Sequence, residues 1–279
     1  MPFFNLKDGT KVFYEQYGPE EGFNLIFIHG WGVSSVWFSE IIPYIKEHGY
    51  RITIFDFPGH GRYSEKRNKG YTYEQIRLDC IDMLENLNLK NKPIGLLGWS
   101  AGGGIIQRLY LDPEFRPFIK CLIIIGGNYS VIHNPVSKSL WGALMLPINL
   151  GFSPLLIFGK KRLIRRVAPL LAIYWKKPKD NVSMWLHDLL LLDRDTMTRE
   201  LKEILKFNLK DDLCNIKIPT LILAGRNDLI TPVKDQKTMD ELMPNSELHL
   251  IKGAGHMVLV THSDDINPII VDFLKKHGF

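Results

Sequence analysis

The chain has 279 residues, of which 45% are apolar and 23% are charged, a composition that excludes a disordered or collagen-like protein. Its 35 Lys and Arg residues against 30 Asp and Glu residues give a formal net charge of +5. That excess is too small for a dedicated nucleic-acid-binding protein, unless it is concentrated in one region. The three cysteines show no CxxC spacing, which argues against a disulfide framework or a thiolate zinc site. We therefore expect a protein of a reducing compartment, the cytoplasm, without a metal or cofactor.

The first expected elements form a β-hairpin, because residues 3–6 and 11–17 flank the turn signal Asp8-Gly9. Short apolar runs that predict buried strands then alternate with amphipathic segments that predict helices. The expected strands are Leu25–Ile28, Ile52–Phe55, Ile94–Leu97, Leu122–Ile125, Leu221–Ala224 and Leu248–Ile251. The expected helices are Val36–Glu47, Tyr73–Asn86, Ala101–Leu111, Lys234–Met243 and Asp264–Lys276. This alternation predicts an α/β protein with an open, doubly wound, mostly parallel sheet.

The strand pattern stops between residues 128 and 211, where helical segments and loops carry large apolar residues such as Trp141. An insertion of this length between two strands predicts a helical cap, or lid, on a core made of residues 1–127 and 212–279. The N-terminus lacks the basic and apolar regions of a signal peptide.

The net charge is unevenly divided between these two parts. Residues 128–211 hold 14 Lys and Arg against 7 Asp and Glu, and the core holds 21 against 23. The excess is densest around Lys160, Lys161, Arg162, Arg165 and Arg166. Three explanations stay open: a solvated helix face, a surface for an acidic carrier protein or its phosphopantetheine, and contact with an anionic membrane.

Residues 139–158 contain no charged side chain, which is about the length that spans a bilayer. Pro147 and Pro154 interrupt this segment and would break a spanning helix. We favour an apolar lid folded over a pocket, with a lid that touches a membrane as the alternative and a transmembrane span as the least favoured one.

The strongest chemical signal is Gly98-Trp99-Ser100-Ala101-Gly102, which lies between an expected strand and an expected helix. A G-x-S-x-G sequence at such a junction forms a strained turn that exposes the serine hydroxyl. Ser100 is therefore the candidate nucleophile, and it needs a base to take its proton. An ordinary glycine-rich packing turn is the alternative interpretation.

Two further residues complete a candidate triad. His256 in Gly253-Ala254-Gly255-His256 and Asp228 in Gly225-Arg226-Asn227-Asp228 each follow an expected strand. Functional groups gather at the carboxyl ends of the strands in open α/β sheets. By itself, His256 could be a solvated loop residue and Asp228 a turn-capping one, but the order Ser100, Asp228, His256 favours catalysis.

The oxyanion of an acyl-transfer reaction also needs hydrogen-bond donors. We expect them to be the backbone N–H of Ala101 and that of Trp31 in the loop His29-Gly30-Trp31-Gly32.

With these motifs and Asp56-Phe57-Pro58-Gly59-His60-Gly61, the chain resembles the α/β-hydrolase superfamily over essentially its whole length. One departure is Tyr63, which stands between Arg62 and Ser64 where the usual pattern has the serine directly after the arginine. The motifs around His29 and Ser100 are similar to those of the esterases that demethylate pimeloyl-carrier-protein methyl ester. In those esterases a basic cap receives an acidic carrier protein.

The serine nucleophile argues against the dehalogenases and epoxide hydrolases of the superfamily, which attack with an aspartate. The resemblance implies a serine carboxylic-ester hydrolase that acts on an acyl ester held under the cap, including a carrier-protein methyl ester. The alternatives are a lipase-like enzyme with a membrane-touching lid, a C–C bond hydrolase, a cofactor-free perhydrolase and a non-catalytic binding relative. The expected substrate contacts are His29, Trp99, Trp141, Arg162, Arg165 and Arg166.

Overall fold

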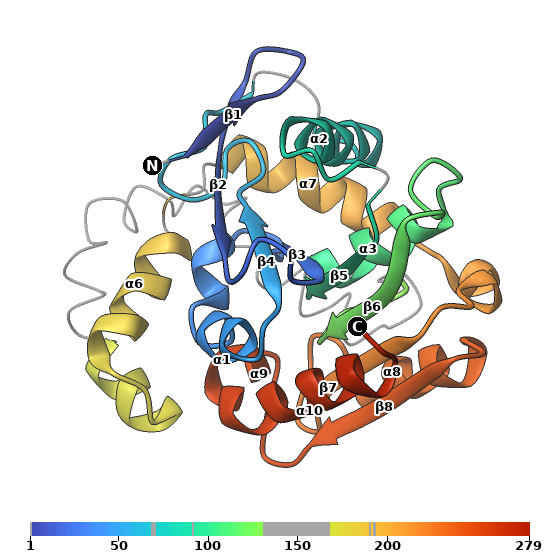
Figure 1. Cartoon of the computed structure of the whole chain (residues 1–279). Coiled ribbons are helices and arrows are strands. Elements are labelled where there is room, and N and C mark those ends of the chain that lie inside the picture. The colour runs from blue at the N-terminus through green and yellow to red at the C-terminus, as the bar shows by residue number, and fades with distance from the viewer. Residues whose placement is uncertain (1, 68–70, 91, 131–167, 190, 192–193) are drawn as a thin grey trace.

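The computed structural model describes residues 2–67, 71–90, 92–130, 168–189, 191 and 194–279. Within these residues, eight strands form one sheet in the order β1-β2-β4-β3-β5-β6-β7-β8 (Figure 1). Strand β2 pairs antiparallel with β1 and β4, and all the later pairings are parallel. The strands are β1 (Phe3–Asn5), β2 (Lys11–Tyr17), β3 (Asn24–Ile28), β4 (Arg51–Phe55), β5 (Ile94–Trp99), β6 (Ile119–Ile125), β7 (Thr220–Gly225) and β8 (Ser246–Ile251). The predicted α/β-hydrolase architecture, with its antiparallel start, is confirmed.

Helices cover both faces of this sheet (Figure 1). Side chains of α1 and α10 pack in the core on one face, and those of α2, α3 and α8 pack in the core on the other. Strand β3 serves both cores, because Leu25 and Phe27 point to the first and Ile26 and Ile28 to the second. The helices are α1 (Ile42–Glu47), α2 (Tyr73–Asn86), α3 (Ala101–Leu111), α6 (Lys179–Leu189), α7 (Arg194–Lys206), α8 (Val233–Leu242), α9 (Val258–Thr261) and α10 (Ser263–Lys276).

The helix expected over Val36–Glu47 is wrong as a single element. A 3-10 helix at Ser35–Phe38 is followed by a separate α1 that begins at Ile42. Pro43 lies in the first turn of α1, where its missing N–H costs nothing, but it would break a helix that continued through it. The prediction that every parallel strand is buried on both faces also fails at β8, which is partly exposed because it is the edge strand.

Helices α6 and α7 lie between β6 and β7 in the chain, inside the region expected to form a cap. Residues 168–175 are also helical. The domain boundaries themselves stay a prediction, and the uncharged segment 139–158 lies outside the described residues. No helix of the described part of the chain has the length and apolar character needed to cross a bilayer.

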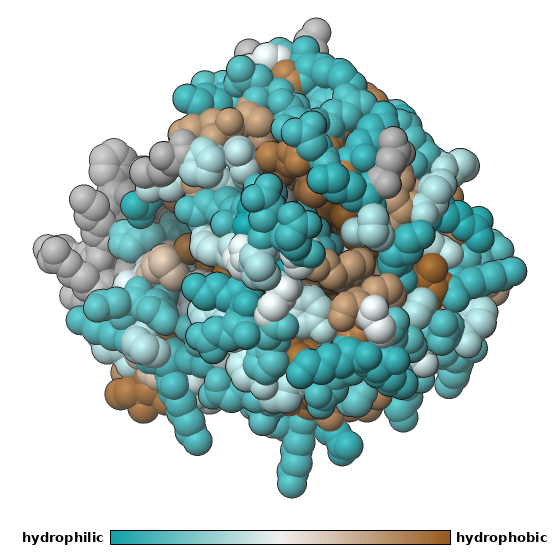
Figure 2. Space-filling model, viewed as in Figure 1, coloured by the Kyte–Doolittle hydropathy of each residue, from teal (hydrophilic) through white to brown (hydrophobic). Residues whose placement is uncertain are grey.

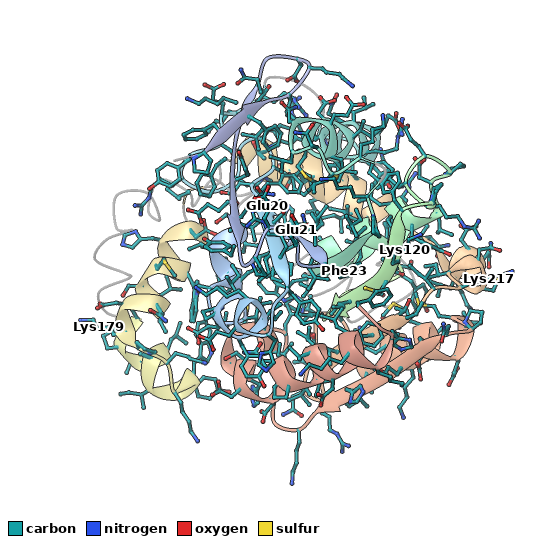
Figure 3. All side chains as sticks on the ribbon, viewed as in Figure 1. Glu20, Glu21, Phe23, Lys120, Lys179 and Lys217 are labelled. Carbon is teal, nitrogen blue, oxygen red and sulfur yellow. The ribbon has the colours of Figure 1, made fainter. Side chains whose placement is uncertain are left out.

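The view in Figure 1 faces a surface that is mainly hydrophilic, as Figure 2 shows, with smaller hydrophobic areas between the polar side chains. Glu20, Glu21 and Phe23, which are labelled in Figure 3, come just before β3. They therefore mark the amino edge of the parallel strands, and the candidate site described next lies at the opposite, carboxyl edge. Cys80 and Cys121 are buried, Cys214 is exposed, and none of the three is in a disulfide.

Candidate active site

Ser100 stands on a strained turn between β5 and α3. Its φ of 54° and ψ of −120° are rare for a residue other than glycine. The turn requires glycine on both sides: a Cβ on Gly98 would lie 2.4 Å from the carbonyl oxygen of Gly102, and a Cβ on Gly102 would lie 2.1 Å from that of Ile28. The predicted strained turn is therefore present. The two glycines that signal it in the sequence are those that the backbone contacts within the turn and to the neighbouring strand require.

The structure brings Ser100, His256 and Asp228 into one hydrogen-bonded chain. Ser100 Oγ lies 2.9 Å from His256 Nε2, and His256 Nδ1 lies 2.8 Å from Asp228 Oδ2. The three residues follow β5, β8 and β7, whose carboxyl ends meet at one edge of the sheet. A hydroxyl, an imidazole and a carboxylate in this order can deprotonate the hydroxyl and stabilise the imidazolium that results.

Asp228 is held by a small network of donors. Its Oδ1 accepts hydrogen bonds from the backbone N–H groups of Ile230 (2.8 Å) and Thr231 (2.9 Å), and the hydroxyl of Thr231 donates to Oδ2 at 2.7 Å. Burial raises the pKa of Asp228, but the hydrogen bonds from His256 and Thr231 outweigh it and hold the pKa below its ordinary value. Asp228 therefore stays ionised beside His256.

The loop after β3 approaches the serine closely. A Cβ on Gly30 would lie 3.2 Å from Ser100 Cβ, so glycine lets the loop backbone reach the nucleophile. Trp31 and Ala101 both line the cavity in front of Ser100. Ala101 is the first residue of α3, where backbone N–H groups have no partner within the helix.

A buried group of ionisable side chains lies beside this loop. Burial, and to a smaller extent the charge of His60, lowers the pKa of His29 to about 3, so the imidazole of His29 is neutral. In the neutral ring Nδ1 donates to the carbonyl of Gly30, and Nε2 accepts from the N–H of Phe57 at 3.1 Å. His60 pairs with Glu200 of α7 at 3.1 Å. Burial lowers the pKa of His60, but Glu200 outweighs it and the pKa lies above its ordinary value.

A cavity opens in front of Ser100. His29, Trp31 and Ala101 lie in its wall near the nucleophile. Most of its wall is apolar and comes from the core and from α7, and includes Phe57, Tyr71, Ile76, Ile105, Ile204 and Phe207. A largely apolar cavity with a few polar groups at one end is typical of a site for a small organic ligand.

The other expected substrate contacts differ in their outcome. Trp99 is buried, stacks on Trp37 with 5.2 Å between ring centroids, and donates from Nε1 to the carbonyl of His256. It therefore supports the histidine loop and is absent from the cavity wall formed by the described residues. The remaining expected contacts, Trp141, Arg162, Arg165 and Arg166, lie outside the described residues.

The structure also adds residues that the sequence reasoning missed. Thr231 orients Asp228, and the spacing Asp228-Leu229-Ile230-Thr231 was the available signal, because an aspartate often accepts from the backbone a few residues further on. Tyr73, Arg108 and Glu203 form the far wall of the cavity, and no local signal marks them. Within the described residues, no group of three or more His, Cys, Asp or Glu is placed to hold a metal ion.

The family described as serine aminopeptidase, S33, matches residues 22–262, which include every residue of the candidate triad. The chain belongs to this family. It is thus a serine hydrolase of the α/β-hydrolase fold, and the predicted class of enzyme is confirmed.

Similar proteins extend over the whole S33-family chain. A non-heme haloperoxidase of Rhodococcus erythropolis is 25% identical and covers 99% of this chain and 100% of its own length. A pimeloyl-[acyl-carrier protein] methyl ester esterase of Legionella pneumophila is 26% identical over 95% of this chain and 99% of its own. A solved esterase from a Rhodococcus species has a TM-score of 0.81 at 21% identity, with 99% of each chain covered. The enol-lactonase of Burkholderia xenovorans has a TM-score of 0.79 at 19% identity, and covers 98% of this chain and 100% of its own.

Proposed function

We propose that this S33-family chain is a serine carboxylic-ester hydrolase, with Ser100 as nucleophile, His256 as general base and acid, and Asp228 as the group that orients His256. The observation that carries the proposal is the hydrogen-bonded chain from Ser100 Oγ through His256 to Asp228. Relatives named as esterases support an ester as the substrate.

The reaction proceeds in two steps. In the first step His256 Nε2 takes the proton of Ser100 Oγ, and Oγ attacks the ester carbonyl. His256 then passes that proton to the leaving alcohol. The N–H groups of Trp31 and Ala101 would stabilise the tetrahedral oxyanion. In the second step His256 deprotonates water, which hydrolyses the acyl-enzyme and frees Ser100. Ionised Asp228 keeps the proton of His256 on Nδ1 and stabilises the imidazolium in both steps.

The test is Ser100→Ala with p-nitrophenyl butyrate as substrate. We expect kcat/KM to fall at least a thousandfold with the fold unchanged by circular dichroism, because no other group takes over as nucleophile. Ser183→Ala, on the outer surface of α6, is the matched control and should keep wild-type activity. Activity of the Ser100 variant within tenfold of the wild type would refute the assignment.

The finer proposal is a carrier-protein methyl ester as the natural substrate, with an acidic carrier protein at the basic cap. It is supported by the excess of Lys and Arg in residues 128–211 and by the relatives named pimeloyl-[acyl-carrier protein] methyl ester esterase. Comparing turnover of such an ester with that of free esters of graded chain length tests it. Turnover of short free esters alone would remove the carrier protein from the proposal.

Relatives named non-heme haloperoxidase favour one second candidate, perhydrolysis by the same triad. In that reaction hydrogen peroxide replaces water and gives a proton to His256 as it attacks the acyl carbon. The bond from that carbon to Ser100 Oγ then breaks, the acyl group leaves as a peroxy acid, and Ser100 recovers the proton from His256. Halide-dependent bromination of monochlorodimedone in acetate and hydrogen peroxide would detect it. A Ser100→Ala variant that brominates as fast as the wild type would contradict it.

A further inference from the structure

The cavity follows one face of α3 away from Ser100. Ala101, Gly104, Ile105 and Arg108 all line it, and their spacing of three or four residues places them in one row along the helix. At a rise of about 1.5 Å per residue, Arg108 lies roughly 10 Å further along the axis than Ala101. Glycine at position 104 lets the ring of Phe207 approach α3 closely, because a Cβ there would lie 2.9 Å from that ring.

The acyl part of an ester fits this row better than the leaving group does. His256 must protonate the leaving group, so the leaving group departs on the side of the imidazole. His256 approaches Ser100 from the side of Asp228 and is absent from the cavity wall formed by the described residues. The acyl chain is therefore left to extend along α3, toward Arg108.

Two carboxylates at the far end of the cavity are each paired with a basic side chain. Glu200 pairs with His60, and Glu203 pairs with Lys206 at 2.7 Å. A polar groove adjoins this end and shares Tyr73, Arg108 and Glu203 with the cavity. Two carboxylates of that groove, Glu74 and Asp112, pair with Arg77.

Arg108 differs from these paired groups. Its guanidinium carbon lies 3.8 Å from the centroid of the Tyr73 ring, and it forms no ion pair with a carboxylate of the described residues. Arg108 is an exposed residue, and its guanidinium carries several N–H donors. The hydroxyl of Tyr73 is buried and has no hydrogen-bond partner within the described part of the chain. Such a hydroxyl is costly unless a ligand completes it.

We propose that Arg108 and Tyr73 bind the anionic end of the acyl chain, so that the enzyme prefers half-esters of dicarboxylic acids to esters of neutral fatty acids. The proposal rests on the proposed ester-hydrolase function and adds a substrate class to it. It is an alternative to the carrier-protein ester, whose acyl chain is joined to the carrier at its far end and has no free carboxylate there. The planar guanidinium suits a carboxylate, and the Tyr73 hydroxyl supplies a second donor. An acyl chain of about eight carbons matches the distance between the nucleophile and Arg108.

The experiment compares two p-nitrophenyl esters with the same leaving group and chain length: the mono-ester of suberic acid, which ends in a carboxylate, and the ester of octanoic acid. We expect the wild type to have the higher kcat/KM for the suberate ester. Arg108→Gln should lower kcat/KM for that ester at least tenfold, mainly through KM, and change the octanoate value by less than threefold. Tyr73→Phe keeps the ring under Arg108 and should lower the preference about threefold.

Arg116→Gln is the matched control, because Arg116 also stacks on a tyrosine, Tyr110, but is not part of the cavity wall. It should leave the preference unchanged. Two results overturn the inference and leave the proposed function intact: a wild type that hydrolyses octanoate without preferring suberate, and an Arg108 variant that loses both substrates equally. A wild type that is no faster than Ser100→Ala on either ester overturns the proposed function, and the inference with it.

Discussion

Thr231 provides two of the contacts that hold the Asp228 carboxylate in line with His256. Its backbone N–H donates to Oδ1, and its hydroxyl lies 2.7 Å from Oδ2 and 3.0 Å from the carbonyl oxygen of Gly126. Oδ2 is also the atom that accepts from His256. The single hydroxyl proton is shared between these two acceptors, and Oδ2 receives donors from both Thr231 and His256.

At this scale we predict that Thr231→Val lowers kcat/KM for p-nitrophenyl butyrate about tenfold. Valine has a similar shape but removes the hydroxyl that donates to Oδ2. Asp228 then orients His256 less well, and the pKa of Asp228 rises. Thr231→Ser keeps the hydroxyl and should restore at least half of the wild-type value. Equal losses in the valine and serine variants would indicate a packing role for the methyl group instead.

Some residues of the candidate site could be predicted from the sequence, and others could not. Ser100 follows directly after a strand, and Asp228 and His256 lie in the loops that follow two others, so a local motif and the chain order are enough to select them. The importance of Arg108 and Tyr73 depends on which side chains surround them once α2, α3 and α7 are packed together. Trp99 is an expected substrate contact that fails, because alternation along β5 turns its side chain into the core.

At the scale of elements, α6 is joined to the loop that carries Trp31. The carboxylate of Asp188, near the end of α6, accepts from the backbone N–H and hydroxyl of Ser34 and from Trp37 Nε1, at 2.7 to 3.0 Å. Ser34 follows two residues after Gly32, so this contact also holds the loop after β3. At the other end of α6, Lys177 and Asn181 both donate to Glu40.

We predict that Asp188→Ala lowers the free energy of unfolding by about 2 to 4 kcal/mol, because it leaves buried donors on Ser34 and Trp37 without an acceptor. It should also lower kcat/KM, because the loop that carries Trp31 loses its anchor. Urea unfolding and ester hydrolysis measure the two effects. Asp180→Ala removes an exposed carboxylate from the first turn of the same helix and should cost less than about 1 kcal/mol. Equal unfolding midpoints for the two variants would contradict this role of Asp188.

The elements that sequence patterns predicted correctly are those whose periodicity is set by the sheet they pack on. Tyr73–Asn86 and Ala101–Leu111 match α2 and α3 to the residue. The failure at Val36–Glu47 has a local cause. The apolar periodicity continues across Pro43, but one continuous helix cannot, because proline has no N–H to donate. The link between α6 and the loop after β3 joins residues more than 150 positions apart, and no periodicity reports such a contact.

At the scale of the whole molecule, buried ionisable groups link the core to the inserted region. Asp56 accepts from the N–H of Ser35 and lies close enough to Asp188 and His60 to feel both charges. Burial raises the pKa of Asp56 to about 7, and Asp188 adds to the shift. His60 in turn pairs with Glu200. The ionisation of this group is therefore coupled to folding near neutral pH.

The sign of that coupling follows from the two states of each group. Between the ordinary aspartate pKa of 3.8 and about 7, Asp56 is protonated in the folded chain and ionised in the unfolded chain. Stability from this residue is then present at low pH and is lost as the pH rises toward 7. His29 acts in the opposite direction, since its folded pKa of about 3 lies below the ordinary histidine value of 6.5, and its contribution grows as the pH rises through that window.

Because the two residues oppose each other in the wild type, the test compares the wild type with Asp56→Asn, which keeps an oxygen acceptor for Ser35 but does not titrate. We predict that the variant gains stability relative to the wild type, on the order of 2 kcal/mol, between pH 5 and pH 8. Urea unfolding at several pH values measures this difference. Asp272→Asn, at an exposed position of α10, is the matched control, and its difference from the wild type should change little with pH. A difference for Asp56→Asn that is the same at pH 5 and pH 8 would show that Asp56 is ionised in the folded protein at both, and that burial does not control its charge.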